Sequence, residues 1–173
     1  MKHYYTGVGS RKTPDDVLFA IVTLAVGMGT LGYTLRSGGA EGADTAFEEG
    51  SEGQCCIYLP WKGFNGRAHC ALERPTLKAR KMAATIHPNW EGLSDGAKAL
   101  HARNCHQVLG DDLATPSDLL ICWTPDGCES EATRTKSTGG TATAIVLADR
   151  HGIPIFNLGA NDGLRRLHNY LEL

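Results

Sequence analysis

Three glycine-rich turns constrain most strongly what this chain can fold into and what it can hold. They occupy residues 7–11 (GVGSR), 37–44 (SGGAEGAD) and 138–141 (TGGT), each after an apolar strand-like run or at the start of a helix-like one. Glycine adopts positive φ and lets the backbone approach a ligand closely, and the first turn of a helix presents unpaired N–H groups. The turns therefore predict a site for the phosphate of a nucleotide or of another phosphorylated ligand.

Apolar runs that alternate with helical periodicity predict the fold class. Strand-like runs fall at 3–8, 33–36, 55–59, 119–123 and 153–157, and helix-like segments fall between them and at 164–171. Strictly alternating strands and helices pair in parallel through right-handed crossovers. We expect an α/β, three-layer Rossmann-like fold, with a mainly parallel sheet of about five or more strands flanked by helices.

The length of 173 residues fits one domain spanning 1–173. The regular pattern breaks down at about 60–90, where Trp61 and Phe64 are interleaved with basic residues such as Arg67 and Arg80. This segment is interpreted as an elaborated flap whose aromatic rings stack on a base and whose cations reach a phosphate. The alternative is a pair of core aromatics beside a solvated basic face.

The charge balance, the cysteines and the absence of long apolar runs disfavour several classes of partner. Lys+Arg 17 against Asp+Glu 19 gives a net charge of −2, which disfavours non-specific binding to duplex DNA. The six cysteines form no C-x-x-C pair, and no membrane-length apolar run is present, so we expect a cytoplasmic protein with reduced thiols and no membrane partner. His101 and Cys105 are four apart, but no ligand pair has zinc-finger spacing, and we expect neither a metal nor a cofactor.

The first two turns carry different chemistry. At 7–11, we expect one phosphate to be bound by backbone N–H groups, the Ser10 hydroxyl and the Arg11 guanidinium. The turn is not the dinucleotide fingerprint G-x-G-x-x-G, because Lys12 occupies the position of the third glycine. At 37–44, Asp44 lies one turn inside the helix, where it caps N–H groups or accepts a ribose hydroxyl. All three turns belong to the carboxyl edge of the predicted sheet, where ligands bind in open α/β folds.

Together the three turns resemble those of the SLOG superfamily of Rossmann-like nucleotide-binding proteins. This superfamily includes the DNA-processing protein DprA/Smf and the LOG ("lysine decarboxylase-like") phosphoribohydrolases. The segments 59–64 (LPWKGF), 102–104 (ARN) and 122–127 (CWTPDG) look like those of compact single-domain members found in bacteriophage and bacterial genomes. The resemblance covers nearly the whole chain and implies a nucleotide or nucleotide-derived ligand.

With the turns, the resemblance implies a set of ligand-binding residues along the carboxyl edge and the helix that precedes the fourth strand. The set is Gly9, Ser10, Arg11, Ser37, Gly38, Gly39, Gly42, Asp44, Trp61, Arg103, Asn104, Thr124, Gly139, Gly140 and Thr141.

The chain departs from the enzymatic branch of this superfamily. LOG enzymes resemble one another in a P-G-G-x-G-T-x-x-E run whose glutamate supports cleavage of an N-glycosidic bond. Laid on Gly139 and Gly140, this chain has Ala142 in place of the later glycine and Val146 in place of the glutamate. An oxocarbenium-like state needs a carboxylate, so an enzyme of this type would use Asp44 or Glu129 as the catalytic residue, with Asp126 and Glu131 as further alternatives.

Three functions are weighed. The first is a sensor or sequestering protein that binds a nucleotide-derived ligand, either an ADP-ribose-like signal or a nucleoside phosphate. The second is a nucleoside 5′-monophosphate N-glycosidase (phosphoribohydrolase). The third is DprA-like binding of single-stranded DNA, against which the net charge weighs, so that we do not expect this partner. We also expect a homodimer or higher homo-oligomer, with the apolar stretch 18–31 as an interface.

Overall fold

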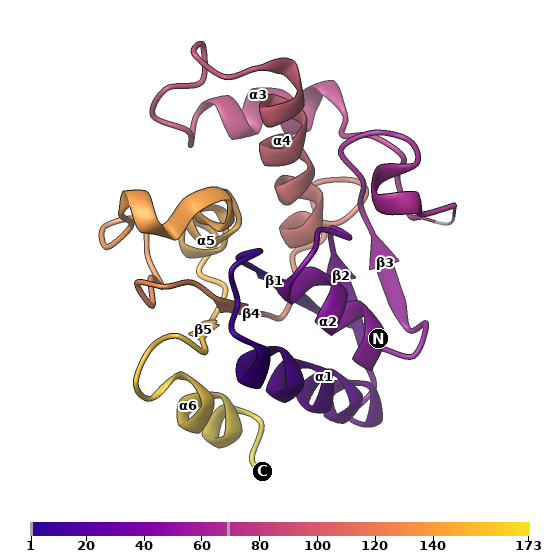
Figure 1. The fold of residues 1–173 in the computed structure, drawn as a ribbon, viewed down its shortest axis with the longest axis vertical. Helices are drawn as coiled ribbons and strands as arrows, with labels where there is room; N and C mark the ends of the chain where they lie inside the picture. Colours follow the sequence, from indigo (N-terminus) through magenta and orange to yellow (C-terminus); the bar gives the residue numbers. More distant parts are fainter. Residues whose placement is uncertain (1, 69) are drawn as a thin grey trace.

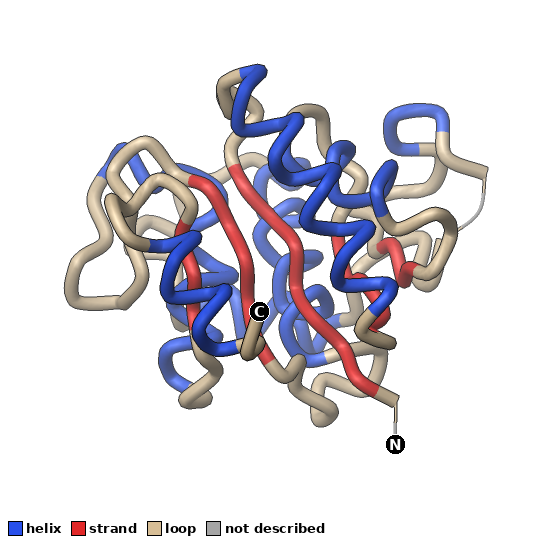
Figure 2. Tube along the Cα trace, turned by 90° about the horizontal axis from the view of Figure 1, so that it is seen from below, coloured by secondary structure: helices blue, strands red, loops and turns tan. Residues whose placement is uncertain are grey.

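A five-stranded parallel sheet forms the centre of the protein. The computed structural model describes residues 2–68 and 70–173. The strands are β1 (His3–Gly9), β2 (Tyr33–Ser37), β3 (Cys55–Ile57), β4 (Leu119–Trp123) and β5 (Ile155–Asn157), and their order across the sheet is β3-β2-β1-β4-β5. Figure 2 shows the strands side by side, with helices in front of them and behind them. The α/β, Rossmann-like prediction is therefore confirmed.

The helices form one layer on each face of this sheet. One layer holds α1 (Asp15–Thr30), α2 (Ala43–Gly50) and α6 (Gly163–Tyr170), and the other holds α3 (Leu77–Ala84), α4 (Asp95–Leu109) and α5 (Ala142–Arg150). Figure 1 shows α4 rising from the sheet beside α3, and α1 and α6 at the opposite end. None of the described helices is long and apolar enough to cross a membrane.

Alternating side chains of the strands feed two separate cores. In β4, Leu119 and Ile121 pack against α1 and α2, whereas Leu120 and Cys122 pack against α4 and α5. A strand sends successive side chains to opposite faces, so a strand covered on both faces is apolar throughout. This requirement explains why β4 is a short continuous apolar run in the sequence.

The flap expected at about 60–90 is more regular than the sequence pattern indicated. It contains a short 3-10 turn, η1 (Phe64–Gly66), and the helix α3. The hydroxyl of Thr76 accepts a hydrogen bond from the Ala79 backbone N–H, at 3.2 Å, and so caps the start of α3. Ala79 and Ala83 then bury one face of the helix against the core shared with α4.

The order of the strands places a crevice between β1 and β4. The chain runs outward from β1 through β2 to β3, and then returns through α3 and α4 to β4 on the other side of β1. Ligands of open α/β sheets bind where the winding direction reverses, beyond the carboxyl ends of the strands. The carboxyl ends of β1 and β4 are paired residue for residue, with Gly9 opposite Trp123.

Candidate functional site

A cavity of about 410 Å³ lies at this reversal point. Its lining comes from the turn after β1, the start of α2, the inward face of α4 and the segment that opens α5. The exposed part, here called the rim, comprises Arg11, Lys12, Ser137, Gly139 and Gly140. The buried part, here called the floor, comprises Val8, Ala40, Asp44, Arg103, Asn104 and Gln107.

Two cations stand on the rim, in the turn that follows β1. The Ser10 backbone N–H donates to the Trp123 carbonyl at 3.2 Å, and the Ser10 hydroxyl accepts from the Lys12 N–H at 3.0 Å. These bonds fix the path of the turn where β1 leaves the sheet. Neither Arg11 nor Lys12 forms an ion pair with a carboxylate of residues 2–68 or 70–173. Their charges are therefore available to an anion in the cavity.

The turn at 138–141 lines the same cavity as Arg11 and Lys12, and hydrogen bonds to Asp126 hold it in place. Thr135 and Thr138 form a capping box at the start of η2 (Lys136–Thr141), and both hydroxyls also donate to Asp126 Oδ2, each at 2.6 Å. Burial works to raise the pKa of Asp126, but these hydrogen bonds outweigh it and hold the pKa below its usual range. A charged Asp126 thus braces this turn from outside the cavity.

The glycines of this turn are exposed and have open space beside them. A Cβ built at Gly139 or Gly140 would meet no atom of the described chain within 4 Å, and Gly139 has a φ of +63°. The backbone of the turn is consequently accessible from the cavity at the start of α5. Such helix starts present unpaired N–H groups to anions.

A buried ion pair forms the centre of the floor. Arg103 Nη1 lies 4.0 Å from Asp44 Oδ2, and both side chains are almost fully buried. Burial raises the pKa of Asp44, although Arg103 and backbone N–H groups, that of Ala40 included, work against this rise. The carboxyl group of Asp44 is thus engaged by the Ala40 N–H, just before α2, and by Arg103.

The two neighbouring residues on α4 connect the glycine turns. Arg103 donates to the Gly38 carbonyl and, through Nε, to Asn104 Oδ1 at 3.1 Å. Asn104 Nδ2 in turn donates to the Gly140 carbonyl at 2.9 Å. A continuous set of hydrogen bonds therefore runs from the turn after β2, across α4, to the turn before α5.

His101 adds an uncharged imidazole to the wall of the cavity. Its Nδ1 lies 2.7 Å from the Thr143 hydroxyl, and its ring centroid is 4.6 Å from that of His87. Burial, then the nearby His87 and Arg103, lower the pKa of His101 to about 4. At neutral pH the ring is uncharged, so the positive charge of the cavity comes from Arg11, Lys12 and Arg103.

The cavity brings together more than half of the residues predicted for the site. Those that line it are Gly9, Ser10, Arg11, Asp44, Arg103, Asn104, Gly139, Gly140 and Thr141. Those placed outside its lining are Ser37, Gly38, Gly39, Gly42, Trp61 and Thr124.

Each residue outside the lining has a contact of its own. The Ser37 hydroxyl donates to the Gly7 carbonyl at 2.6 Å, and Thr124 Oγ1 accepts from Asn157 Nδ2 at 2.7 Å. Trp61 is 44% exposed and meets Phe64 edge-on, with 5.1 Å between the ring centroids. These side chains are engaged in contacts within the protein and do not line the cavity.

The glycines of the second turn are covered by the protein's own side chains. A Cβ at Gly38 would meet Arg103 and Gln107, and one at Gly39 would meet Arg67 at 2.7 Å. Arg67 itself is held by Glu48, with 2.6 Å between Nη2 and Oε2. The turn at 37–42 is therefore a packed junction.

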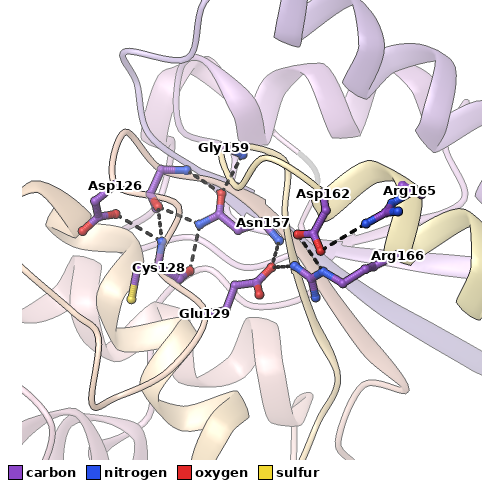
Figure 3. A network of polar contacts seen from close by, with 9 residues as sticks. Asp126, Cys128, Glu129, Asn157, Gly159, Asp162, Arg165 and Arg166 are labelled. Atoms are coloured by element: carbon purple, nitrogen blue, oxygen red, sulfur yellow. Dashed lines mark hydrogen bonds and ion pairs between the residues drawn. The ribbon is translucent and has the colours of Figure 1, made fainter.

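Glu129, the second carboxylate considered for catalysis, lies in a separate network shown in Figure 3. Its Oε1 accepts from the Asn157 backbone N–H at 2.7 Å and pairs with Arg166 Nη2 at 2.5 Å. It is not among the residues that line the cavity, where Asp44 is the one carboxylate of the described lining. No group of three His, Cys, Asp or Glu side chains within 2–68 and 70–173 is arranged as a metal site.

The predicted set of ligand-binding residues omitted five polar residues that line the cavity: Lys12, His101, Gln107, Ser137 and Thr138. Lys12 and Thr138 directly adjoin predicted positions, so a wider window around each turn would have included them. His101 and Gln107 share with Asn104 one face of α4, at a spacing of three residues. That periodicity was the available signal, since Asn104 was already predicted.

No protein-family model matches this chain, and no curated protein matches its sequence. A solved structure of DNA processing protein A from Helicobacter pylori is similar, with a TM-score of 0.58, 18% sequence identity, and coverage of 99% of this chain and 74% of that one. The likeness supports the Rossmann-like fold of the DprA type. That protein is described as having a unique single-stranded DNA binding mode.

This similarity corrects one expectation. The net charge of −2 was the ground for not expecting single-stranded DNA as a partner. The expectation is wrong, because a protein with this fold is described by its binding of single-stranded DNA. Net charge averages over the whole surface, whereas a nucleic acid contacts only a local cluster of cations.

Proposed function

We propose that the cavity binds the phosphate of a nucleotide or nucleotide-derived ligand, and that the protein binds this ligand without cleaving it. One observation carries the proposal. Arg11 and Lys12, which form no ion pair within the described residues, line the same cavity as the open glycine turn at 138–141. Cationic side chains and accessible helix-start N–H groups are the usual partners of phosphate.

The size of the cavity supports a ligand of one nucleotide. Sites for small molecules commonly enclose about 300–1,000 Å³, and this cavity, at about 410 Å³, lies near the lower end of that range. A mononucleotide matches this volume better than a dinucleotide does.

The state of Asp44 supports binding over hydrolysis. A carboxylate that assists cleavage of an N-glycosidic bond must reach the sugar or an attacking water. Asp44 is buried, accepts from the Ala40 N–H and pairs with Arg103. Glu129 is engaged by Arg166 outside the lining.

The test is calorimetric titration with the four ribonucleoside 5′-monophosphates and their nucleosides. Each monophosphate that binds should do so at least about tenfold more tightly than its nucleoside, since a phosphate placed between two cations gains charge-assisted hydrogen bonds. The double variant Arg11→Ala/Lys12→Ala should lose this advantage, whereas Lys78→Ala/Lys81→Ala, which removes the same charge from the exposed side of α3, should keep it. Equal affinity for nucleoside and monophosphate would contradict the proposal.

The same samples, analysed by chromatography for free base, test the absence of cleavage. We expect no base above the rate of the protein-free control. Release that depends on the protein and disappears in Asp44→Asn would replace the binding proposal with the N-glycosidase.

Binding of single-stranded DNA is the second candidate, favoured by the similarity to DNA processing protein A. The exposed cations Arg74, Lys78 and Lys81 recur along α3 and its approach, and none pairs with a carboxylate of the described residues. They offer a path for phosphates outside the cavity. Salt-dependent binding of a labelled oligonucleotide that is lost in Lys78→Ala/Lys81→Ala would support this candidate and the path along α3. Unchanged binding by the variant would contradict the path, and absence of binding by the unmodified protein would contradict the candidate.

A further inference from the structure

Gln107 ends the line of α4 residues that face the cavity. Burial is greater at the C-terminal end of this face: Ala97 and His101 are partly buried, whereas Asn104 is 8% exposed and Gln107 is 1% exposed. The side chain of Gln107 therefore belongs to the innermost part of the floor.

The amide of Gln107 has no hydrogen-bond partner. Neither Nε2 nor Oε1 is bonded to any atom of the described residues, and both atoms are buried. Its backbone, in contrast, is fully used: the carbonyl accepts from the Thr6 hydroxyl at 2.7 Å. Buried polar side-chain atoms are nearly always hydrogen-bonded, and each exception needs an explanation.

The surrounding groups of the described chain form no hydrogen bond with the Gln107 side-chain amide. Arg103, one turn earlier on α4, directs its guanidinium to the Gly38 carbonyl and to Asn104. Gly38 provides room for the amide, because a Cβ at this position would lie 2.3 Å from Gln107 Nε2. The floor thus holds one donor and one acceptor that remain unmatched beside a cavity.

The distribution of charge indicates which end of a ligand meets this amide. The rim carries Arg11 and Lys12 without carboxylate partners, whereas the floor carries Arg103 already paired with Asp44. An anionic phosphate is favoured at the rim, and an uncharged polar group is favoured at the floor.

We propose that Gln107 recognises the base of the nucleotide, through a bidentate pair in which Nε2 donates to a base acceptor and Oε1 accepts from a base N–H. This inference rests on the proposed function. Glutamine is an established bidentate reader of adenine, whose N6–H donates and whose N7 accepts on one edge, whereas guanine has two acceptors and no donor on that edge. Gln107 is a specificity-determining residue in this arrangement, and the phosphate contacts at the rim contribute affinity common to all bases.

The experiment compares base preference between matched variants, measured as the ratio of Kd values for the four ribonucleoside 5′-monophosphates. In the unmodified protein we expect the best and worst bases to differ by roughly tenfold or more, as one bidentate amide–base pair provides. Gln107→Met keeps the length of the side chain and removes both polar atoms, so the ratio should fall to within about threefold. Gln54→Met, at an exposed position in the loop between α2 and β3, should keep the ratio of the unmodified protein.

A second substitution gives a signature that a structural role would not produce. Gln107→Glu offers acceptors only, so it should shift the preference toward guanine, whose pairing edge has two adjacent N–H donors. The variant Arg11→Ala/Lys12→Ala should weaken all four monophosphates together and leave their ratio unchanged.

Folding does not confound the test. Replacing an unpaired buried amide by an apolar group of similar shape is neutral or stabilising, so Gln107→Met should unfold at the same temperature or higher. If Gln107→Met nevertheless failed to fold, Gln107→Leu would provide the same comparison.

The outcomes separate the two proposals. A ratio that is unchanged in Gln107→Met, or equal affinity of the unmodified protein for all four bases, overturns the role of Gln107 and leaves the proposed function standing. Absence of binding to any monophosphate overturns the proposed function and this inference with it.

Discussion

Two glycine-rich turns of this protein look alike in sequence but have different structural roles. At 37–42, the glycines lie against Arg103, Gln107, Arg67 and the backbone of the turn after β1, so that added side chains would collide with the protein itself. At 138–141, the glycines line the cavity, and a Cβ at either position would meet no atom of the described residues within 4 Å. The first turn of the pair uses glycine to let the protein pack, and the second uses it to leave room.

The comparison shows what a glycine pattern means physically. Absence of a side chain permits close approach of any atom, and the sequence does not say whether that atom belongs to a ligand or to the protein. The atoms that surround each glycine in the structure show whether it makes room for the protein's own side chains or leaves open space. If this division is correct, substitutions at the packed turn and its partners should reduce stability, whereas substitutions at the open turn should reduce ligand affinity.

The largest effect is expected for Arg103→Met, which leaves Asp44 buried without its cation. Breaking a buried pair by removing one partner costs about 3–5 kcal/mol, and urea denaturation of the free protein would measure it. In Asp44→Asn/Arg103→Met, where neither charge remains, we expect part of this loss to be recovered. A double variant less stable than Arg103→Met would show that the pair is not the source of the stability.

Gly42→Ala should come next and directly tests the packed turn. Its φ is +84°, and a Cβ would lie 2.8 Å from the Ser10 carbonyl oxygen and 2.9 Å from the Arg11 Cα. Strained backbone and overpacking together cost about 3 kcal/mol, which lowers the Tm of a protein of this size by roughly 6–12 °C.

Gly140→Ala is the matched control at the open turn. With no atom within 4 Å of its Cβ and no positive φ, it should change the Tm by less than about 2 °C. Its methyl group points into free space at the rim, so nucleotide affinity should fall instead. If both alanines were equally destabilising, the two turns would not differ as described.

Asp126→Ala should have an intermediate effect on the open turn. It removes the acceptor shared by the hydroxyls of Thr135 and Thr138, at a cost of about 1–2 kcal/mol. Nucleotide affinity should also fall, because the turn loses its brace. Asp126→Asn keeps an acceptor oxygen and should lose less of both quantities, as thermal denaturation and titration would show.

A pH dependence of stability is also expected from His101, which lines the cavity. The pKa of His101 is lowered to about 4 in the folded protein, against about 6.5 in an unfolded chain, so the unfolded chain takes up the proton first as the pH falls. The free energy of unfolding is therefore highest, as far as His101 determines it, above pH 6.5, and it falls as the pH falls toward 4. His106, whose pKa burial also lowers, acts in the same direction.

His101→Gln should therefore flatten the rise of Tm between pH 4 and 6.5, while keeping a partner for the Thr143 hydroxyl. His168→Gln, at an exposed position on α6, should leave the slope unchanged. A slope that is the same in all three proteins would contradict the assignment to His101.

The sheet was predictable because each strand coincides with a short run of mainly apolar residues bounded by turn residues. The structure places a strand in each of the five runs; β4 is apolar throughout, whereas β2 also carries the buried polar residues Thr34, Arg36 and Ser37. Helix α3 was not predicted, because it is short and only Ala79 and Ala83 bury its inner face. Two small side chains produce too weak an apolar pattern to be read along the chain.

The site was predictable where backbone chemistry defines it and not where packing does. Arg11, Asn104 and Gly140 were found from turns and from the resemblance, and all line the cavity. Gln107 was missed, because nothing in the sequence reveals that its amide is buried without partners. The covering of Gly38 by Arg103 is likewise a contact between segments about sixty residues apart, which local pattern cannot supply.

The bonds from Arg103 and Asn104 to the two turns have a consequence for synthesis of the chain. The cavity joins segments near residue 10 to segments near residue 140, and α4 bridges them. A nascent polypeptide on the ribosome would thus have no cavity until α5 had emerged, even with β1, β2 and β3 already formed. Ligand capture would then mark completion of the fold, and a fragment that stops before residue 137 should be unable to bind.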